Sequence, residues 1–302
     1  MKAIILAAGL GTRLRPLTEK KPKALMPVVN RPIIARNIEY LKIHGVDKIA
    51  VNAHHHYRQI LDYLDKGMPF GIDMEVLIET EILGTGGGIK NCSSICKDEP
   101  FFVLNSDILT NIDLSKAYEY HKKSGSIASL ILHDHEPYNQ ILIDDNRRII
   151  DIDRKNTSNR LAFSGIHILE PDIFSFIPET GYSDIIDCYR RLVHKKNTIN
   201  TFISEGHYWH DIGTLSGYFK ANQEILNLEK RTFSIGRNSQ IDPSVRIKEW
   251  AVIGDRSILG KGVKVERSII WDNVKVKENI NITDSVVTSF REIEDDLSGG
   301  FY

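Results

Sequence analysis

The densest group of residues that could perform chemistry lies near the N-terminus, in the segment LAAGLGTRLRPLTEKKPKALMPV at positions 6–28. Gly9 and Gly11 allow the backbone to turn and to expose successive N–H groups, which bind phosphate oxygens without side chains. Arg13 adds a planar guanidinium suited to a polyphosphate. Lys23 adds a second cation directly after Pro22. The segment therefore predicts a polyphosphate site.

Two common glycine-rich phosphate loops do not fit this segment. A Walker loop needs Gly-Lys-Ser/Thr after its spacer, whereas Gly11 is followed by Thr12 and Arg13. The dinucleotide fingerprint needs a third glycine where Leu14 stands. A simple strand-to-helix turn would explain the glycines alone, but it does not explain the cations that follow them.

The elements around this segment predict the fold that positions it. Strands are predicted at 2–8, 47–52, 74–78 and 101–105, and helices at 32–44, 57–64 and 86–95. This alternation indicates an α/β fold with a Rossmann-like, mostly parallel sheet flanked by helices. Ligands of such sheets bind at the carboxyl ends of the strands. Gly9 and Asp107 both fall at that edge, although an aspartate also commonly caps a helix or a turn.

The middle of the chain has a looser pattern. We expect strands at 127–133, 140–144, 149–153 and 162–168, some of them antiparallel, and helices at 114–123 and 217–230. From Ile235 onward an aliphatic or large apolar residue recurs every sixth position, and the register then slips by one. The first row is Ile235, Ile241, Ile247, Ile253, Leu259, Val265 and Trp271, and the shifted row is Ile270, Val276 and Ile282.

A six-residue period with glycines at the turns predicts a parallel β-helix, because each triangular coil has three six-residue sides. We therefore divide the chain into a catalytic domain at 1–232, a β-helix at 233–290 and a frayed acidic tail at 291–302. The β-helix is interpreted as an oligomerisation or scaffolding module.

The composition limits the partners of the chain. Its 302 residues include 39 Lys and Arg against 40 Asp and Glu, so a basic surface for nucleic acid is not expected. Three cysteines favour a reducing compartment. No apolar run approaches the roughly 18 residues that cross a bilayer, and no signal-peptide core is recognised. We expect a cytoplasmic protein that does not bind membranes.

The segment at 6–28 closely resembles the N-terminal signature of the sugar-1-phosphate nucleotidyltransferases, also called nucleotide-sugar pyrophosphorylases. The similarity continues in GTGGG at 84–88, NSD at 105–107, FSGI at 163–166 and WHDIGT at 209–214. It implies Mg²⁺-dependent transfer of a nucleoside monophosphate from a nucleoside triphosphate to a sugar 1-phosphate, with release of pyrophosphate. A C-terminal left-handed β-helix is frequent in this family.

The resemblance also implies roles for individual residues. Arg13 and Lys23 would be the catalytic cations at the α-phosphate, and Asp107 and Asp211 would hold Mg²⁺. The family usually has glycine where Ser106 stands. The residues expected to bind the nucleotide are Leu6, Ala7, Ala8, Gly9, Gly11, Thr12, Arg13, Lys23, Glu79, Gly84, Thr85, Gly86 and Asp107.

The sugar side follows from the same resemblance. Asn139, Ser164 and Gly165 would line the sugar pocket. Lys155 stands where the family has the lysine of a Glu-Lys-Pro-like element, with Arg154 as the alternative contact for the sugar phosphate. Alternatively, Arg154 and Lys155 are solvated cations of a loop and do not bind the substrate.

Two further motifs suggest the substrates, and other residues argue against two alternative functions. VNAHHH at 51–56 and the glycine run at 84–88 are most similar to the mannose-1-phosphate guanylyltransferase-like branch, which favours GTP with a manno-configured sugar 1-phosphate. UTP or another triphosphate with a different sugar is the alternative. A hexapeptide acyltransferase would need a catalytic histidine in the β-helix, and none follows His210. A non-catalytic regulator would have lost Arg13, Lys23 or Asp107.

Overall fold

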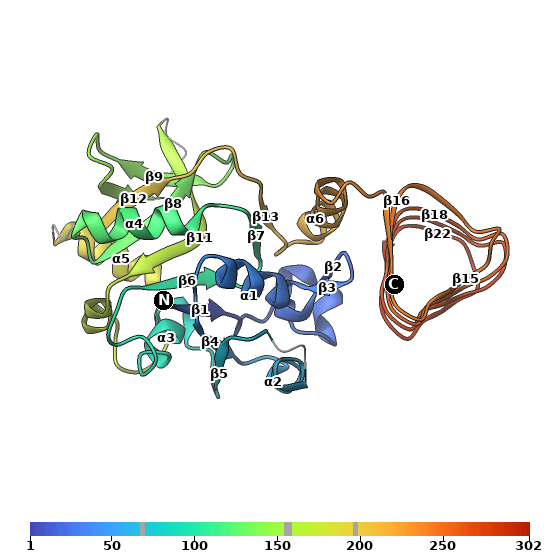
Figure 1. Ribbon diagram of the computed structural model, residues 1–302, viewed down its shortest axis with the longest axis horizontal. Coiled ribbons are helices and arrows are strands. Elements are labelled where there is room, and N and C mark those ends of the chain that lie inside the picture. The colour runs from blue at the N-terminus through green and yellow to red at the C-terminus, as the bar shows by residue number, and fades with distance from the viewer. Residues whose placement is uncertain (67–69, 154–158, 196–198) are drawn as a thin grey trace. The chain divides into compact units, whose positions relative to one another are not determined.

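The computed structural model describes residues 1–66, 70–153, 159–195 and 199–302 (Figure 1). The chain forms two compact units. The first contains Met1–Leu10, Pro22–Ala24 and Ile34–His210, and the second contains Gly11–Lys21, Leu25–Ile33 and Asp211–Tyr302. The glycine-rich segment is therefore divided between the units.

The first unit is built on a sheet that has nine strands among the described residues. Its parallel half has the order β6-β1-β4-β5, formed by β1 (Lys2–Leu6), β4 (Lys48–Ala53), β5 (Asp73–Ile78) and β6 (Phe101–Asn105). Ala3, Ile4 and Ile5 of β1 are fully buried, as are Phe101 and Phe102 of β6. The predicted mostly parallel α/β sheet is confirmed, because strands buried on both faces read as continuous apolar runs.

The other half of this sheet is mixed. β11 (Arg160–Leu169) runs antiparallel to β6, β8 (Ala128–His133) and β9 (Asn139–Ile143), while β10 (Ile149–Ile152) pairs antiparallel with β9. The expected antiparallel additions are thus present. β12 (Ile199–Ile203), which pairs parallel with β8, was not predicted from the sequence.

The described residues form six helices, and all but the one at Ile185–His194 correspond to helices predicted from the sequence. They are α1 (Ile33–Ile43), α2 (Tyr57–Lys66), α3 (Gly84–Asn91), α4 (Leu114–Ser124), α5 (Ile185–His194) and α6 (Leu215–Leu228). Short elements complete the chain up to α6: η1 (Thr12–Leu14), η2 (Leu17–Glu19), η3 (Lys23–Leu25), β2 (Pro27–Val28), β3 (Arg31–Pro32), β7 (Ile108–Thr110), η4 (Pro171–Phe176) and β13 (Trp209–Asp211). No helix among the described residues is long and apolar enough to cross a membrane.

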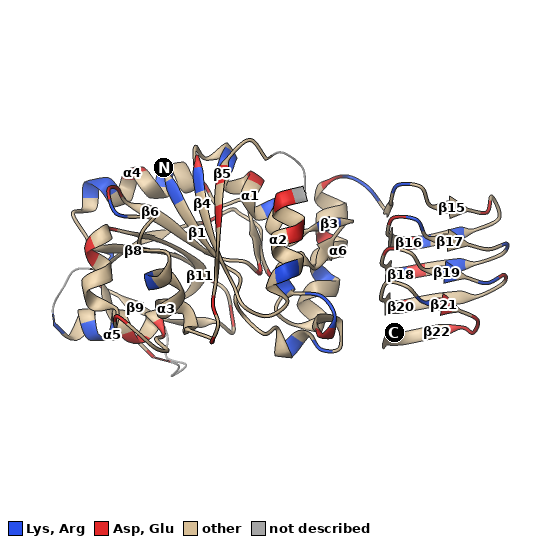
Figure 2. Cartoon of the chain, turned by 90° about the horizontal axis from the view of Figure 1, so that it is seen from below, with Lys and Arg blue, Asp and Glu red and all other residues tan. Residues whose placement is uncertain are grey.

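The second unit contains two parallel sheets that the chain visits in alternation (Figure 2). One has the order β14-β16-β18-β20-β22 and the other β15-β17-β19-β21. The strands of the first sheet are β14 (Phe233–Ile235), β16 (Arg246–Ile253), β18 (Lys264–Ile270), β20 (Asn281–Val287) and β22 (Leu297–Phe301). Those of the second are β15 (Gln240–Ile241), β17 (Ile258–Leu259), β19 (Lys275–Val276) and β21 (Glu292–Ile293). This repeated return is consistent with the predicted coil.

The strand register confirms the slip of one residue. Ile235 pairs with Ile253, eighteen positions on, whereas Ile253 pairs with Ile270, seventeen positions on. Ile270 therefore takes the inward position that the six-residue period assigned to Trp271, and it is Ile270 that joins the buried apolar cluster between the sheets. Trp271 is not part of this cluster, although it is only 4% exposed.

Residues 291–302, expected to be a frayed acidic tail, instead continue the two sheets. β21 pairs with β19, and β22 pairs with β20. Two of the acidic side chains that suggested fraying form ion pairs with lysines one turn earlier: Glu292 contacts Lys275 and Glu294 contacts Lys277. The repeating apolar residues therefore determine the structure of residues 291–302, and their acidic composition does not prevent strand pairing.

Candidate active site

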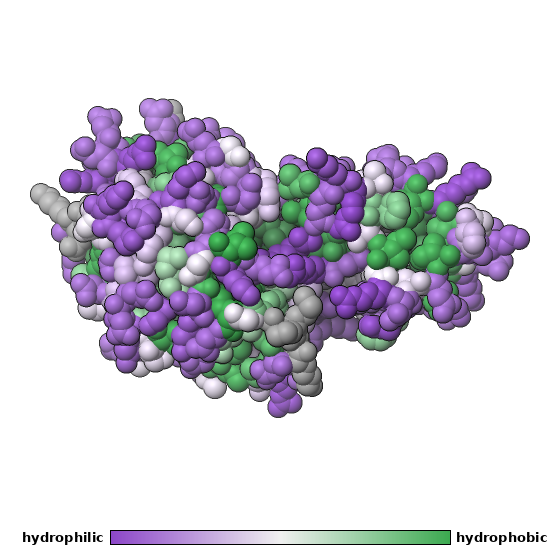
Figure 3. All heavy atoms as spheres, in the orientation of Figure 1, coloured by the Kyte–Doolittle hydropathy of each residue, from purple (hydrophilic) through white to green (hydrophobic). Residues whose placement is uncertain are grey.

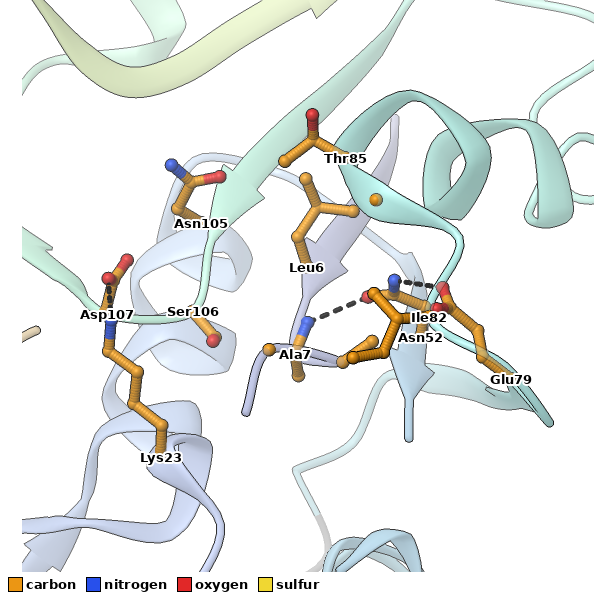
Figure 4. Close-up of a pocket in the computed structure, with 13 residues that line it drawn as sticks. Leu6, Ala7, Lys23, Asn52, Glu79, Ile82, Thr85, Asn105, Ser106 and Asp107 are labelled. Carbon is orange, nitrogen blue, oxygen red and sulfur yellow. Dashed lines mark hydrogen bonds and ion pairs between the residues drawn. The ribbon is translucent and has the colours of Figure 1, made fainter. Parts of the chain in front are cut away.

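A pocket of about 240 Å³ lies at the carboxyl ends of β1, β4 and β6 in the first unit (Figure 4). Nine of the residues predicted to bind a nucleotide line it: Leu6, Ala7, Ala8, Gly9, Lys23, Glu79, Gly84, Thr85 and Asp107. Four more line it as well, namely Asn52, Ile82, Asn105 and Ser106. The parallel sheet thus brings together segments that lie a hundred residues apart.

One side of the pocket is a buried hydrogen-bond network around Asn52 (Figure 4). The backbone N–H of Ala7 donates to Asn52 Oδ1 at 2.8 Å, and Asn52 Nδ2 donates to Glu79 Oε1 at 2.6 Å. Glu79 Oε2 accepts from the backbone N–H of Leu83 at 3.1 Å. Asn52 and Glu79 are 2% and 3% exposed. Because a buried polar group needs its partners, this network fixes the Glu79 carboxylate beside the first strand.

Helix α3 approaches this network closely enough to require glycine. A Cβ at position 88 would lie 2.4 Å from Asn52 Nδ2, and one at position 86 would lie 2.8 Å from Ser183 Oγ. Thr85 stands between Gly84 and Gly86, and its hydroxyl donates to Asp184 Oδ1 at 3.0 Å. The GTGGG run therefore serves the close packing of α3 against the pocket wall.

The opposite side of the pocket carries an ion pair between Lys23 Nζ and Asp107 Oδ2. Both side chains are 15% exposed. The turn that carries Asp107 is held by two hydrogen bonds, from Ser106 N to Leu6 O at 3.1 Å and from Asn37 Nδ2 to Ser106 O at 3.1 Å. Ser106 is not among the residues with a positive φ, so a side chain is accommodated there without backbone strain.

Arg13 and Asp211 belong to the second unit, together with Gly11 and Thr12. Arg13 is 62% exposed, and its Nη2 lies 4.0 Å from Asp211 Oδ2. Asp211 Oδ1 accepts from Gly213 N at 2.6 Å. Gly11 has a φ of +65°, and a Cβ there would lie 2.9 Å from Thr18 Cγ2. The loop thus presents the Arg13 guanidinium to solvent beside a carboxylate.

The residues predicted to bind the sugar have different surroundings in the structure. Gly165, with a φ of +81°, packs against Asn105 of the pocket, because a Cβ there would lie 3.0 Å from Asn105 Nδ2. Ser164 is fully buried, and its hydroxyl donates to Ile131 O. The Asn139 amide is used within its own loop, where Nδ2 donates to Asp134 Oδ1. Lys155 and Arg154 lie outside the described residues.

An imidazole cluster packs beside Ser164. The indole N–H of Trp209 donates to Ser164 O at 2.8 Å, and the rings of His133 and His135 lie edge-on to this indole, each 4.9 Å away. His133 Nδ1 lies 3.1 Å from His207 Nε2. Burial, together with the neighbouring imidazoles, lowers the pKa of His133 to about 4. His133 is therefore neutral at pH 7.

Comparison with known proteins identifies the family. Residues 2–228 match the family described as nucleotidyl transferase. The chain belongs to this family. A mannose-1-phosphate guanyltransferase of Debaryomyces hansenii is 32% identical and is matched over 95% of this chain and 86% of its own length. A UTP–glucose-1-phosphate uridylyltransferase of Synechocystis is 27% identical, over 95% and 87% respectively.

Solved structures agree with this assignment. HddC from Yersinia pseudotuberculosis complexed with GMP-PN has a TM-score of 0.64 and 27% identity, covering 74% of this chain and 99% of that one. A putative glucose-1-phosphate thymidylyltransferase from Bacillus anthracis, with a TM-score of 0.67 and 24% identity, covers 74% and 94% and supports the fold. The predicted family, and with it a nucleotidyltransferase enzyme, is confirmed.

Proposed function

We propose that this nucleotidyl transferase joins the nucleoside monophosphate of a triphosphate to a sugar 1-phosphate and releases pyrophosphate. The observation that carries the proposal is the pocket at the strand ends, which has the buried Glu79 carboxylate on one side and the Lys23–Asp107 pair on the other. The relatives named above are sugar-1-phosphate enzymes, which supports the same reaction.

The chemistry asks for charge stabilisation rather than a strong base. A phosphate oxygen of the sugar 1-phosphate is already an anion; it attacks the α-phosphorus while the bond to pyrophosphate breaks. The barrier lies in bringing two anions together and in supporting charge on the leaving group, so positioned cations supply most of the catalysis. Lys23 and Arg13 are the cations that we assign to this task.

Mg²⁺ is the metal that we assign, with Asp107 and Asp211 as its protein ligands. Both residues offer the carboxylate oxygens that Mg²⁺ prefers, and one or two carboxylates plus phosphate oxygens are its usual ligands. No group of three or more potential metal-ligating side chains was found in the part of the chain that the structure describes. A site completed by substrate phosphates fits that composition. Bound there, Mg²⁺ would neutralise phosphate charge.

Glu79 favours a guanine base. A carboxylate only accepts hydrogen bonds, and each of its oxygens retains a lone pair beyond the bonds from Asn52 and Leu83. Guanine presents two adjacent donors, N1–H and N2–H₂, whereas uracil presents one N–H between two carbonyl oxygens that the carboxylate would repel. GTP with mannose 1-phosphate is therefore our first choice. UTP with a different sugar 1-phosphate remains the second, since one relative carries that name.

Other parts of the chain receive assignments within this proposal. Lys155, with Arg154 as the alternative, would hold the sugar phosphate. We place the catalytic domain at 1–232 and a left-handed β-helix after it. Figure 3 shows apolar side chains gathered on the parallel sheets of the second unit, and edge strand β14 exposes Phe233 and Ile235 by 46% and 41%. That edge would join two copies of the chain.

The three cysteines are buried free thiols, which suits the reducing cytoplasm.

The decisive test is pyrophosphate release over a matrix of four triphosphates and a dozen sugar 1-phosphates, with Mg²⁺ and with EDTA. The expected result is the highest kcat/KM for GTP with mannose 1-phosphate, and no turnover in EDTA. Silence of every pair in Mg²⁺ would overturn the reaction, and a faster rate with UTP would overturn the choice of base.

A further inference from the structure

Trp271 leaves the interior of the parallel sheets and contacts two other parts of the second unit. Its indole N–H donates to the hydroxyl of Tyr218 on α6 at 2.9 Å. Lys21 Nζ lies over the indole ring, 5.3 Å from its centroid. The seventeen-residue step from Ile253 to Ile270 causes this arrangement, because it gives the inward position to Ile270 and frees the next residue.

Tyr218 extends this contact to the segment after Lys23. Its hydroxyl, which accepts from Trp271, donates to Pro27 O at 2.6 Å, and the residue is fully buried. A hydroxyl offers one donor and two acceptor positions, so both bonds can form at once. The backbone carbonyl of Pro27 is thereby linked through one side chain to the indole of Trp271.

The β2–β3 hairpin that begins at Pro27 is attached at further points. Val29 N donates to Asn222 Oδ1 on α6 at 2.8 Å, and Asn30 Nδ2 donates to Ile253 O at 2.7 Å. Val29 and Asn30 have φ values of 48° and 61°, as the tight turn of such a hairpin requires. The Asn222 side chain on α6 and a backbone carbonyl of β16 therefore hold this turn. Strand β16 belongs to one of the two parallel sheets of the second unit, which together are called the strand stack below.

Lys23 lies between the two attached points. Lys21, two residues before it, contacts Trp271, and Pro27, four residues after it, contacts Tyr218. Burial lowers the pKa of Lys21, and the charge of Asp272 opposes this shift. The short stretch that carries Lys23 is thus fixed at both ends by one pair of side chains.

We propose that Tyr218 and Trp271 are positioning residues that fix the backbone on both sides of Lys23, so that the C-terminal strand stack takes part in catalysis. The proposal rests on the function proposed above, in which Lys23 is the cation at the α-phosphate. It gives the stack a task inside a single chain, independent of any association between copies.

The test compares two buried tyrosines that lose the same atom. Tyr218→Phe removes the hydroxyl that joins Pro27 to Trp271, and Trp271→Phe removes the indole N–H as a second, independent variant. Tyr189→Phe is the matched control, because the Tyr189 hydroxyl contacts only His167 Nδ1 among the hydrogen bonds found in the described residues. All three variants keep an aromatic ring in place.

Two readouts separate positioning from general stability. Hydrogen exchange of the backbone amides of residues 24–26, 28 and 29 should accelerate in Tyr218→Phe and Trp271→Phe but not in Tyr189→Phe. Steady-state kinetics should show kcat/KM for the triphosphate falling about fivefold or more, with KM for the sugar 1-phosphate within about twofold of the wild type. Tyr189→Phe should keep the wild-type constants.

Wild-type exchange at 24–29 in both folded variants would overturn the proposal, as would unchanged kcat and KM. A wild-type enzyme that releases no pyrophosphate from any substrate pair would instead overturn the proposed function. In that case the exchange measurement alone would still decide whether Tyr218 and Trp271 hold the segment.

Discussion

Lys23 and Asp107 form an ion pair in the pocket although eighty-four positions separate them in the sequence. Both charges are largely screened from water, and each compensates the other before any substrate binds. In the proposed reaction Lys23 serves a phosphate and Asp107 serves the metal. Substrate binding must therefore exchange this contact for two others, and the two residues should differ in how their loss affects the enzyme.

Asp107→Asn should abolish measurable turnover while leaving the fold intact. The amide keeps the shape and can still contact its neighbours, but it removes the negative charge that Mg²⁺ needs. We expect kcat to fall by about 10³-fold or more, the upper end of the loss for a single electrostatic contact. Pyrophosphate release with circular dichroism as the control measures this. Near-normal activity would remove Asp107 from the metal site.

Lys23→Met should lower kcat by about 10²- to 10³-fold with a smaller change in binding of the triphosphate. Methionine retains most of the unbranched side chain but leaves the Asp107 carboxylate without its cation. Added Mg²⁺ should then bind more tightly than in the wild type, because a competing cation is gone. Titration calorimetry with Mg²⁺ alone provides this second measurement, and unchanged metal affinity would contradict the exchange described above.

Glu79→Gln should reduce the preference for GTP over UTP. The neutral amide turns one acceptor into a donor, so the guanine donors lose a partner while uracil gains one for a carbonyl oxygen. We expect the ratio of kcat/KM values to shift by about 10- to 100-fold, as one or two lost hydrogen bonds to a charged group would cause. An unchanged ratio would show that Glu79 does not contact the base.

Gly88→Ala should destabilise the protein although alanine is the better helix former. The new Cβ would lie 2.4 Å from Asn52 Nδ2, so the buried network must shift. We expect a loss of about 1–3 kcal/mol in the free energy of unfolding, as overpacking usually costs. In an Asn52→Ala background the same change should cost less, and urea unfolding of the four variants would measure this coupling.

Stability should fall as the pH drops from 6.5 toward 4. Burial lowers the pKa of His121 and of His133 to about 4 and that of His167 to about 3, against 6.5 in the unfolded chain. Between these values the unfolded chain binds more protons than the native one, so the free energy of unfolding rises with pH and levels off above 6.5. Urea midpoints at pH 5 and pH 7.5 test this, and His167→Gln should flatten the slope.

The sequence predicted those parts of the site that depend on local pattern. Gly9, Lys23 and Asp107 follow from an apolar strand, a glycine turn and placed charges, and the pocket contains all three. Asn52 could not be predicted, because its role requires β1 and β4 to pair so that Leu6 stands beside Asn52. Such a contact depends on the register of two distant strands.

The C-terminal region shows the same division between local and long-range information. The six-residue period revealed the repeat and its slip, yet the slip alone did not indicate what Trp271 contacts after leaving the interior. The charges of 291–302 suggested a tail, because their partners Lys275 and Lys277 lie one turn away rather than nearby in sequence. Local composition therefore gives a wrong prediction where the ion-pair partners of charged residues lie in the preceding turn of the sheets.

The strand stack has a consequence for how this enzyme can change in length. Asn30 donates to Ser234 Oγ on β14 at 3.2 Å and to Ile253 O on β16, and Lys21 lies over the ring of Trp271, the residue after β18. A parallel stack accepts or loses whole turns at its far end without disturbing the turns already formed. Adding or removing turns of seventeen or eighteen residues would therefore change the outer surface of the C-terminal region while leaving the attachment near Lys23 in place.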